Sequence, residues 1–201
     1  MQRAYDLGVL VRACCSVNSS CGGRDDAGRA PALDARLHRV GDLDFGSSVH
    51  ATTVLDVGPG GDAEANSVWF IESPRPTAFL SDLVFNGTHS YVADGYLLSW
   101  IANLSRLERL RAGMDFVFPG HGAAGAPAQL IAAQRSYLLT LAAHVKELAE
   151  ERPELSDQAK QELERRMTEY LPGAGLTFLI AMNADPVARE LLVPGPPRHA
   201  A

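Results

Sequence analysis

The sequence has no long apolar run, few cysteines and no cluster of basic residues. Its apolar stretches are far shorter than the roughly 20 residues that span a bilayer, so we expect no membrane partner. Three cysteines bunched between Cys14 and Cys21 do not make a disulfide framework. A net charge of −6 without a Lys/Arg cluster argues against a nucleic-acid partner. Because Leu7 to Val11 is closely bracketed by charges and is followed by no convincing cleavage pattern, we expect a cytoplasmic protein.

Length and composition predict one folded domain with appendages. At 201 residues and 46% hydrophobic, the chain can bury a substantial core. Residues 1–35 are poorly patterned and are rich in Ser, Gly, Arg and Asp. Residues 36–150 carry strand and helix patterns, and residues 151–201 read as a helical extension. We therefore divide the chain into these three parts.

The patterned region predicts a sheet followed by helices. A strand-like sequence pattern begins at Leu37, and a β-α-β unit ends in the strand at 116–118. Asp94 is the expected N-cap of the helix in that unit. Pro127 is expected to open the next helix, which Pro153 ends. Further expected elements are strands at 48–57, 68–71 and 77–80, a charged helix capped by Ser156, and a last helical portion at 176–192 that restarts at Asp185-Pro186.

Two short apolar runs end in residues that bind metals in other proteins. Phe116 to Phe118 is followed by Pro-Gly-His-Gly, which contains His121, and the run before it in the predicted sheet ends near Asp82. Glycine allows a sharp turn at a strand end, so an imidazole and a carboxylate are expected at one edge of the sheet. Such a pair can hold zinc or a similar divalent ion. Considered alone, each residue would also suit an ordinary turn.

Residues 79–95 (FLSDLVFNGTHSYVADG), the following helix with Trp100-Ile101, and Pro119 to Gly122 together resemble the carboxyl-terminal half of metallo-β-lactamase-fold hydrolases. The likeness spans roughly residues 40–148. It implies an α/β fold, the αββα sandwich of that family, incomplete in its N-terminal half. It also implies that Asp82 matches an aspartate that bridges two metal ions and that His121 matches a histidine ligand. The implied cofactor is zinc or iron.

The sequence departs from this family at the other metal ligands. The family's His-x-His-x-Asp-His run is absent, and no two of the six histidines lie within ten residues of each other. The loop at 58–67 carries acids where a histidine ligand is expected. A third ligand would come from Asp62, Glu64 or His89, and the alternative for the two acids is a solvated loop. His89 and Asp94 are expected to line the mouth of a substrate pocket, or else to be a loop histidine and a helix cap.

These features leave two functions open. The first is a divergent or truncated metal-dependent hydrolase with an unidentified small-molecule substrate. Such a protein would bind its metal weakly or not at all, and the chain alone would have little or no activity. The second is a noncatalytic remnant that acts as a binding or self-associating module. No catalytic residue is assigned in either case. Because losing half of the family fold would expose apolar sheet surface, a homodimer or poor solubility is expected.

Overall fold

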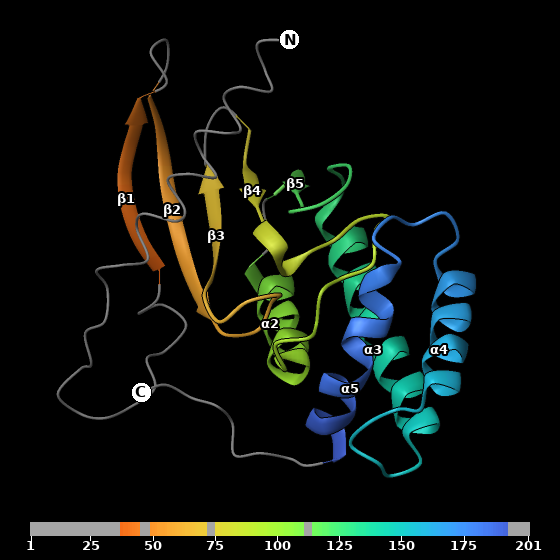
Figure 1. The fold of residues 1–201 in the computed structure, drawn as a ribbon. Coiled ribbons are helices and arrows are strands. Elements are labelled where there is room, and N and C mark those ends of the chain that lie inside the picture. Colours follow the sequence, from red (N-terminus) through yellow and green to blue (C-terminus); the bar gives the residue numbers. More distant parts are fainter. Residues whose placement is uncertain (1–36, 45–48, 72–74, 111–113, 193–201) are drawn as a thin grey trace, which may run out of the picture.

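The computed structural model describes residues 37–44, 49–71, 75–110 and 114–192, and Figure 1 shows their arrangement. The predicted N-terminal segment 1–35, with its three cysteines, lies outside the described residues. Within these ranges, the side chains of residues before Thr52, including His38 and His50, lie outside the description. Within the described part, no helix is long and apolar enough to cross a membrane.

The sheet contains five strands in the order β1-β2-β3-β4-β5. The first four strands pair antiparallel, and β5 joins β4 in parallel. This mixed sheet is the one that the sequence predicts. Its strands are β1 (Leu37–Asp44), β2 (Val49–Gly58), β3 (Asn66–Ile71), β4 (Thr77–Phe79) and β5 (Phe116–Phe118).

The described helices lie on one face of the sheet (Figure 1). Ala78 of β4 and Val117 of β5 point toward them and are fully buried in the main core. Since side chains alternate along a strand, Phe79, Phe116 and Phe118 point to the other face. The core contains Trp100 and three leucines of α2 (Leu97–Leu110). It also contains the apolar side of α3 (Pro127–Ala149), which begins at Pro127 as predicted.

Helix α2 links β4 to the parallel strand β5, which confirms the predicted β-α-β unit. The predicted cap of this helix is wrong. Asp94 lies three residues before Leu97, whereas the carboxylate of Glu190 accepts hydrogen bonds from the backbone N–H groups of Leu97 and Leu98, both at 2.9 Å. A carboxylate at this end is favourable because the helix dipole and the free N–H groups both attract it. The cap therefore comes from the far end of the chain.

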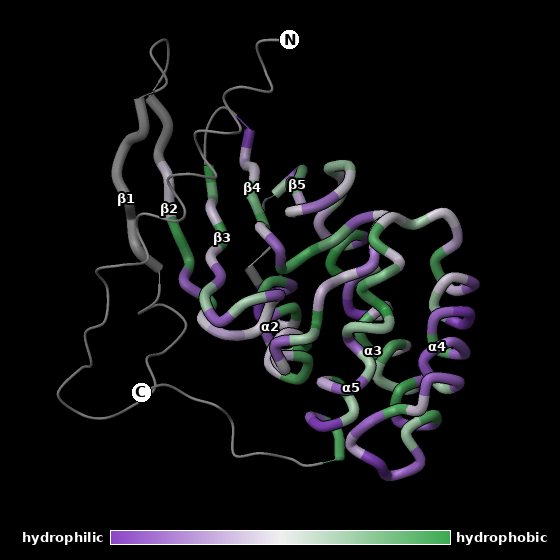
Figure 2. Tube along the Cα trace, in the orientation of Figure 1, coloured by the Kyte–Doolittle hydropathy of each residue, from purple (hydrophilic) through white to green (hydrophobic). Residues whose placement is uncertain are grey.

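The C-terminal helices pack into the same core as the sheet. Helix α4 (Asp157–Tyr170) begins after Ser156, whose side chain accepts from the N–H of Ala159, as predicted. Figure 2 shows α4 as mostly hydrophilic, and only Leu163 and Met167 of its side chains are buried. Helix α5 (Phe178–Leu192) contributes Ile180 and Val187, both fully buried, to the main core.

The predicted restart at Asp185-Pro186 is wrong, because α5 continues through Pro186 without a break. Proline inside a helix removes one hydrogen bond. Tertiary contacts offset that loss here. Val187 is buried directly after the proline, and the Asp185 carboxylate accepts from the backbone N–H of Leu155 at 3.0 Å and pairs with Lys160 at 2.7 Å.

Candidate metal centre

Asp82 lies in a single turn, η2 (Ser81–Leu83), directly after β4. Two segments are joined by hydrogen bonds at this point. The N–H of Leu80 donates to the carbonyl of Phe118 at 2.8 Å, and the N–H of Gly120 donates to the carbonyl of Ser81 at 2.8 Å. The parallel pairing of β4 and β5 therefore continues into the loops that follow. This continuation brings the residues after both strands to one edge of the sheet.

His121 is fixed by the same continuation. The segment around it pairs in parallel with the segment around Phe85, and the N–H of Asn86 donates to the carbonyl of His121 at 2.9 Å. The imidazole stacks on the ring of Phe85 with 4.7 Å between the centroids. The glycines on either side leave room for this approach. Gly122 has φ +88°, and a Cβ there would overlap the carbonyl oxygen of Asn86.

The two predicted ligands converge. Oδ1 of Asp82 lies 3.4 Å from Nε2 of His121. The exposed fractions of the two side chains are 35% for Asp82 and 47% for His121, so solvent reaches both. Partial burial raises the pKa of the Asp82 carboxyl above its usual range, and the nearby His121 opposes this shift.

The charges of Asp82 and His121 both affect the pKa of the nearby Asp62 carboxyl. Loss of solvent raises the pKa of Asp62 to about 6, with a further increase from the negative charge of Asp82. The loop that carries it is held from two sides. The side-chain amide of Asn66 donates to the carbonyl of Ala63 at 2.8 Å, and that of Asn103 in α2 donates to the carbonyl of Gly60 at 3.0 Å. Asp62 therefore lies near Asp82 in a loop that hydrogen bonds hold in place.

Glu64 and Asp94 are less closely tied to the pair. Glu64 is exposed in the Asp62 loop, and no contact within the described residues joins it to Asp82 or His121. Asp94 is also exposed and accepts a hydrogen bond from the hydroxyl of Tyr91 at 2.9 Å, which raises the pKa of that hydroxyl. The charge of Asp94 makes a smaller contribution to the raised pKa of Asp62. The roles assigned to Glu64 and Asp94 stay predictions.

His89 is fully buried, and its ring packs against the side chain of Tyr137 in α3. Its Nδ1 lies 3.2 Å from the Tyr137 hydroxyl, whereas its Nε2 has no hydrogen-bond partner among the described residues. Burial lowers the pKa of this imidazole, so the neutral ring is favoured. No contact joins His89 to Asp82 or His121 in the described part of the chain, and its assignment as ligand or pocket residue stays a prediction.

Two buried amides hold the segment between Asp82 and Asp94 in place. Gln134 of α3 accepts from the N–H of Phe85 at 2.9 Å and donates to the hydroxyl of Ser90 at 2.9 Å. Asn183 of α5 accepts from the N–H of Val92 at 2.7 Å and donates to the carbonyl of Ser90 at 2.8 Å. Sequence reasoning did not assign these positioning residues. The available signal was a polar residue within each apolar helix face.

The donor atoms of Asp82 and His121 suit a shared divalent ion. Two ligand atoms about 2.1 Å from a tetrahedral ion lie roughly 3.4 Å apart, which is the separation found here. A catalytic zinc site needs about three protein ligands. Among the described residues, no three His, Cys, Asp or Glu side chains are placed to hold one ion. The site therefore fits two ligands of an ion but is incomplete as a catalytic set.

Comparison with known proteins returns only structural similarity. No protein-family model matches the chain, and no curated protein matches its sequence. A metallo-β-lactamase from Pontibacter korlensis is similar over 50% of this chain and 46% of its own, with 25% identity and a TM-score of 0.41. The metallo-β-lactamase DIM-1 is similar over the same shares, with 19% identity and a TM-score of 0.40. The chain thus spans a little under half the length of these proteins.

Proposed function

We propose that this chain is a divergent or truncated metal-dependent hydrolase of the metallo-β-lactamase superfamily. Asp82 and His121 bind one divalent ion, zinc or iron, weakly, and the chain alone has little or no hydrolytic activity. One observation carries the proposal, namely the 3.4 Å separation between a carboxylate and an imidazole that follow two parallel strands. The sequence resemblance over residues 40–148 supports the family.

Weak binding follows from the number of ligands. Two protein ligands leave a zinc ion at least one ligand short of a catalytic site. Asp62 is the best placed candidate for a third: burial is the main cause of its raised pKa, and the charge of nearby Asp82 adds to the rise. A bound cation would favour the ionised forms of both carboxyls. Ion binding and loss of the Asp62 proton are therefore coupled.

Low activity follows from the same deficit. When bound in a complete site, such an ion lowers the pKa of a water molecule from about 15.7 to about 7 and so supplies hydroxide at neutral pH. Each pKa unit corresponds to roughly 1.4 kcal/mol, so losing this activation costs more than the shape of a pocket restores. The residues of this chain position donors and exclude part of the solvent, but they do not complete the ion's coordination.

The proposal is tested by hydrolysis assays with added zinc. Simple β-lactam, thioester and phosphodiester substrates should show little or no turnover by the purified chain, while zinc should raise its thermal midpoint. A rate that disappears with chelator and with Asp82→Ala or His121→Ala would contradict the expected inactivity, because it requires further ligands. Asp62, Glu64 and His89 would then be the first residues to substitute.

A second candidate is a noncatalytic binding or self-associating module. One observation favours it, since Asp82 and His121 lie close enough to pair with each other and so to join the two loops without any ion. In that case, protein purified without chelator would contain almost no zinc or iron. Zinc would also leave the thermal midpoint unchanged, and light scattering would report a dimer.

A further inference from the structure

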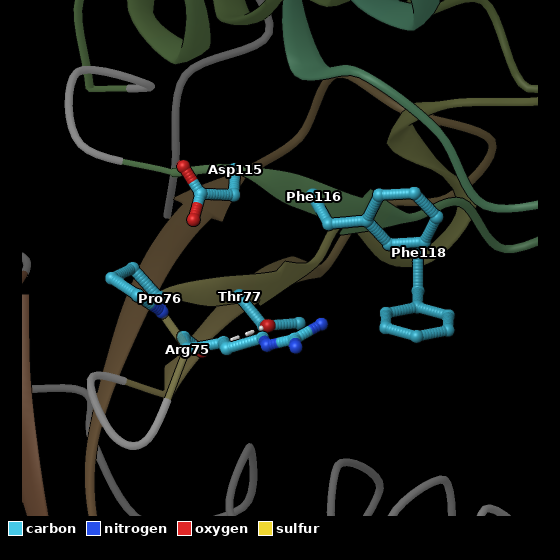
Figure 3. A pocket seen from close by; sticks show the side chains of 6 residues that line it. All are labelled: Arg75, Pro76, Thr77, Asp115, Phe116 and Phe118. Carbon is cyan, nitrogen blue, oxygen red and sulfur yellow. Dashed lines mark hydrogen bonds between the residues drawn. The ribbon is translucent and has the colours of Figure 1, made fainter.

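A pocket lies at the amino ends of β4 and β5, on the face of the sheet that points away from the helices. Its volume is about 400 Å³, which is within the range of small-molecule sites. Asp82 and His121 are not among the described residues that line it. Figure 3 shows the described residues that line it, namely Arg75, Pro76, Thr77, Asp115, Phe116 and Phe118.

Aromatic rings form the apolar wall of this pocket. Phe116 and Phe118 meet edge to face with 5.7 Å between their centroids, and Phe118 stacks on Phe79 with 4.9 Å between centroids. Phe118 is therefore held by rings on both sides, which gives the wall a fixed shape. Phe116 nevertheless remains 44% exposed. A flat apolar group that covered these rings would gain both buried area and ring contacts.

Arg75 supplies a cation beside this wall. Its guanidinium forms no ion pair and donates no hydrogen bond within the described residues, and only its backbone carbonyl is used, by the Thr77 hydroxyl at 3.0 Å. In Figure 3 the guanidinium extends past Thr77 toward Phe118, whereas the carboxylate of Asp115 points away from both rings. The positive group thus faces the pocket and the negative group lies at its far rim. A guanidinium in this position can bind a carboxylate through two parallel hydrogen bonds.

We propose that this pocket binds a small aromatic carboxylate, with the carboxylate on Arg75 and the ring against Phe116 and Phe118. The combination of a ring wall and a planar cation that has no ion pair among the described residues selects such a ligand over a neutral aromatic compound. It also selects against an aliphatic anion, which would leave the rings uncovered. The proposal is independent of the metal centre, because the pocket shares no residue with it.

The test compares two probes by isothermal titration calorimetry on the full chain. The probes are 2-naphthoate and the neutral 2-naphthylmethanol, which have the same ring system. We expect naphthoate to bind at least tenfold more tightly. Arg75→Gln should reduce this preference to less than about threefold, while Arg109→Gln, an equal loss of charge on α2, should leave it unchanged. Zinc and chelator should affect neither probe.

A second variant and a map of the site complete the test. Phe116→Ser changes an exposed side chain, and it should weaken both probes by at least threefold while the circular dichroism spectrum stays unchanged. Amide chemical shifts on adding naphthoate should change at residues 75–77 and 115–118. Equal affinity for the two probes, no effect of Arg75→Gln, or an equal effect of Arg109→Gln would each overturn the proposal. Shifts confined to residues near Asp82 would overturn it as well.

Discussion

Asp82 packs directly over Gly120, and a Cβ at Gly120 would overlap the Oδ1 atom of that aspartate. The same Cβ would lie 2.8 Å from the backbone of Ser81. The carboxylate can therefore approach His121 only because residue 120 has no side chain. This contact links the glycines around His121 to the geometry of the candidate metal centre.

Gly120→Ala is expected to remove zinc binding, and the overlap of its Cβ with the Ser81 backbone is expected to lower stability with and without zinc. The new methyl group displaces the Asp82 carboxylate, so the two donor atoms no longer share an ion. A tenfold excess of zinc over its dissociation constant stabilises the wild type by about 1.4 kcal/mol, and the variant should lose this gain. Differential scanning fluorimetry with and without zinc measures the difference. Gly125→Ala is the control, because a Cβ there meets only ordinary contacts at 3.6 Å or more.

Asp62→Asn is expected to stabilise the metal-free chain at neutral pH. The folded state raises the pKa of Asp62 from 3.8 to about 6, so the folded state holds the extra proton between these values. Stability from this group is therefore greatest below about pH 4 and falls as the pH rises toward 6. With solvent screening, the variant should gain about 1 kcal/mol at pH 7.5 and almost nothing at pH 4.

Urea unfolding at both pH values in chelator measures this gain. Glu64→Gln, which changes an exposed acid in the same loop, is the matched control and should give a much smaller change. A gain for Asp62→Asn that was larger at pH 4 than at pH 7.5 would contradict a raised pKa of Asp62 in the folded state.

Gln134→Leu is expected to destabilise the fold by about 2 to 3 kcal/mol. The substitution leaves the backbone N–H of Phe85 buried without its acceptor and deprives the Ser90 hydroxyl of its donor. Urea unfolding gives the free energy. Gln129→Leu places the same side chain at an exposed position of the same helix and should change stability by less than about 0.5 kcal/mol. Equal effects of the two variants would contradict a positioning role for Gln134.

Glu190→Ala is expected to cost about 1 kcal/mol of stability through α2 rather than α5. The lost carboxylate leaves two N–H groups at the start of α2 without their acceptor. Hydrogen exchange at the amides of Leu97 and Leu98 should accelerate relative to the rest of the chain. Glu164→Ala, an exposed glutamate on α4, should leave both amides unchanged.

Local pattern predicted the sheet, the β-α-β unit and the convergence of Asp82 with His121. These features follow from strand ends and from the parallel pairing of neighbouring strands, which short stretches of sequence encode. The cap of α2 was assigned to Asp94 because local capping is the common case. The observed cap is the carboxylate of Glu190, which lies 93 residues from Leu97 along the chain. A local sequence pattern cannot predict a contact over that separation.

The continuation of α5 through Pro186 was missed for a related reason. A proline signals a helix break when only the sequence neighbours are considered. Burial of Val187 and the bonds of the Asp185 side chain to Leu155 and Lys160 hold the helix together, and they come from other elements. The supporting amides Gln134 and Asn183 were likewise hidden, because their partners lie 49 and 91 residues away.

Equilibrium dialysis against buffered zinc, followed by elemental analysis, measures whether Asp82 and His121 bind an ion. We predict one zinc per chain at saturation, bound weakly enough to be removed by brief treatment with chelator. Asp82→Asn and His121→Gln should each abolish this binding while the circular dichroism spectrum stays unchanged. Zinc that bound equally well to both variants, or no binding at any concentration, would contradict an ion site formed by Asp82 and His121.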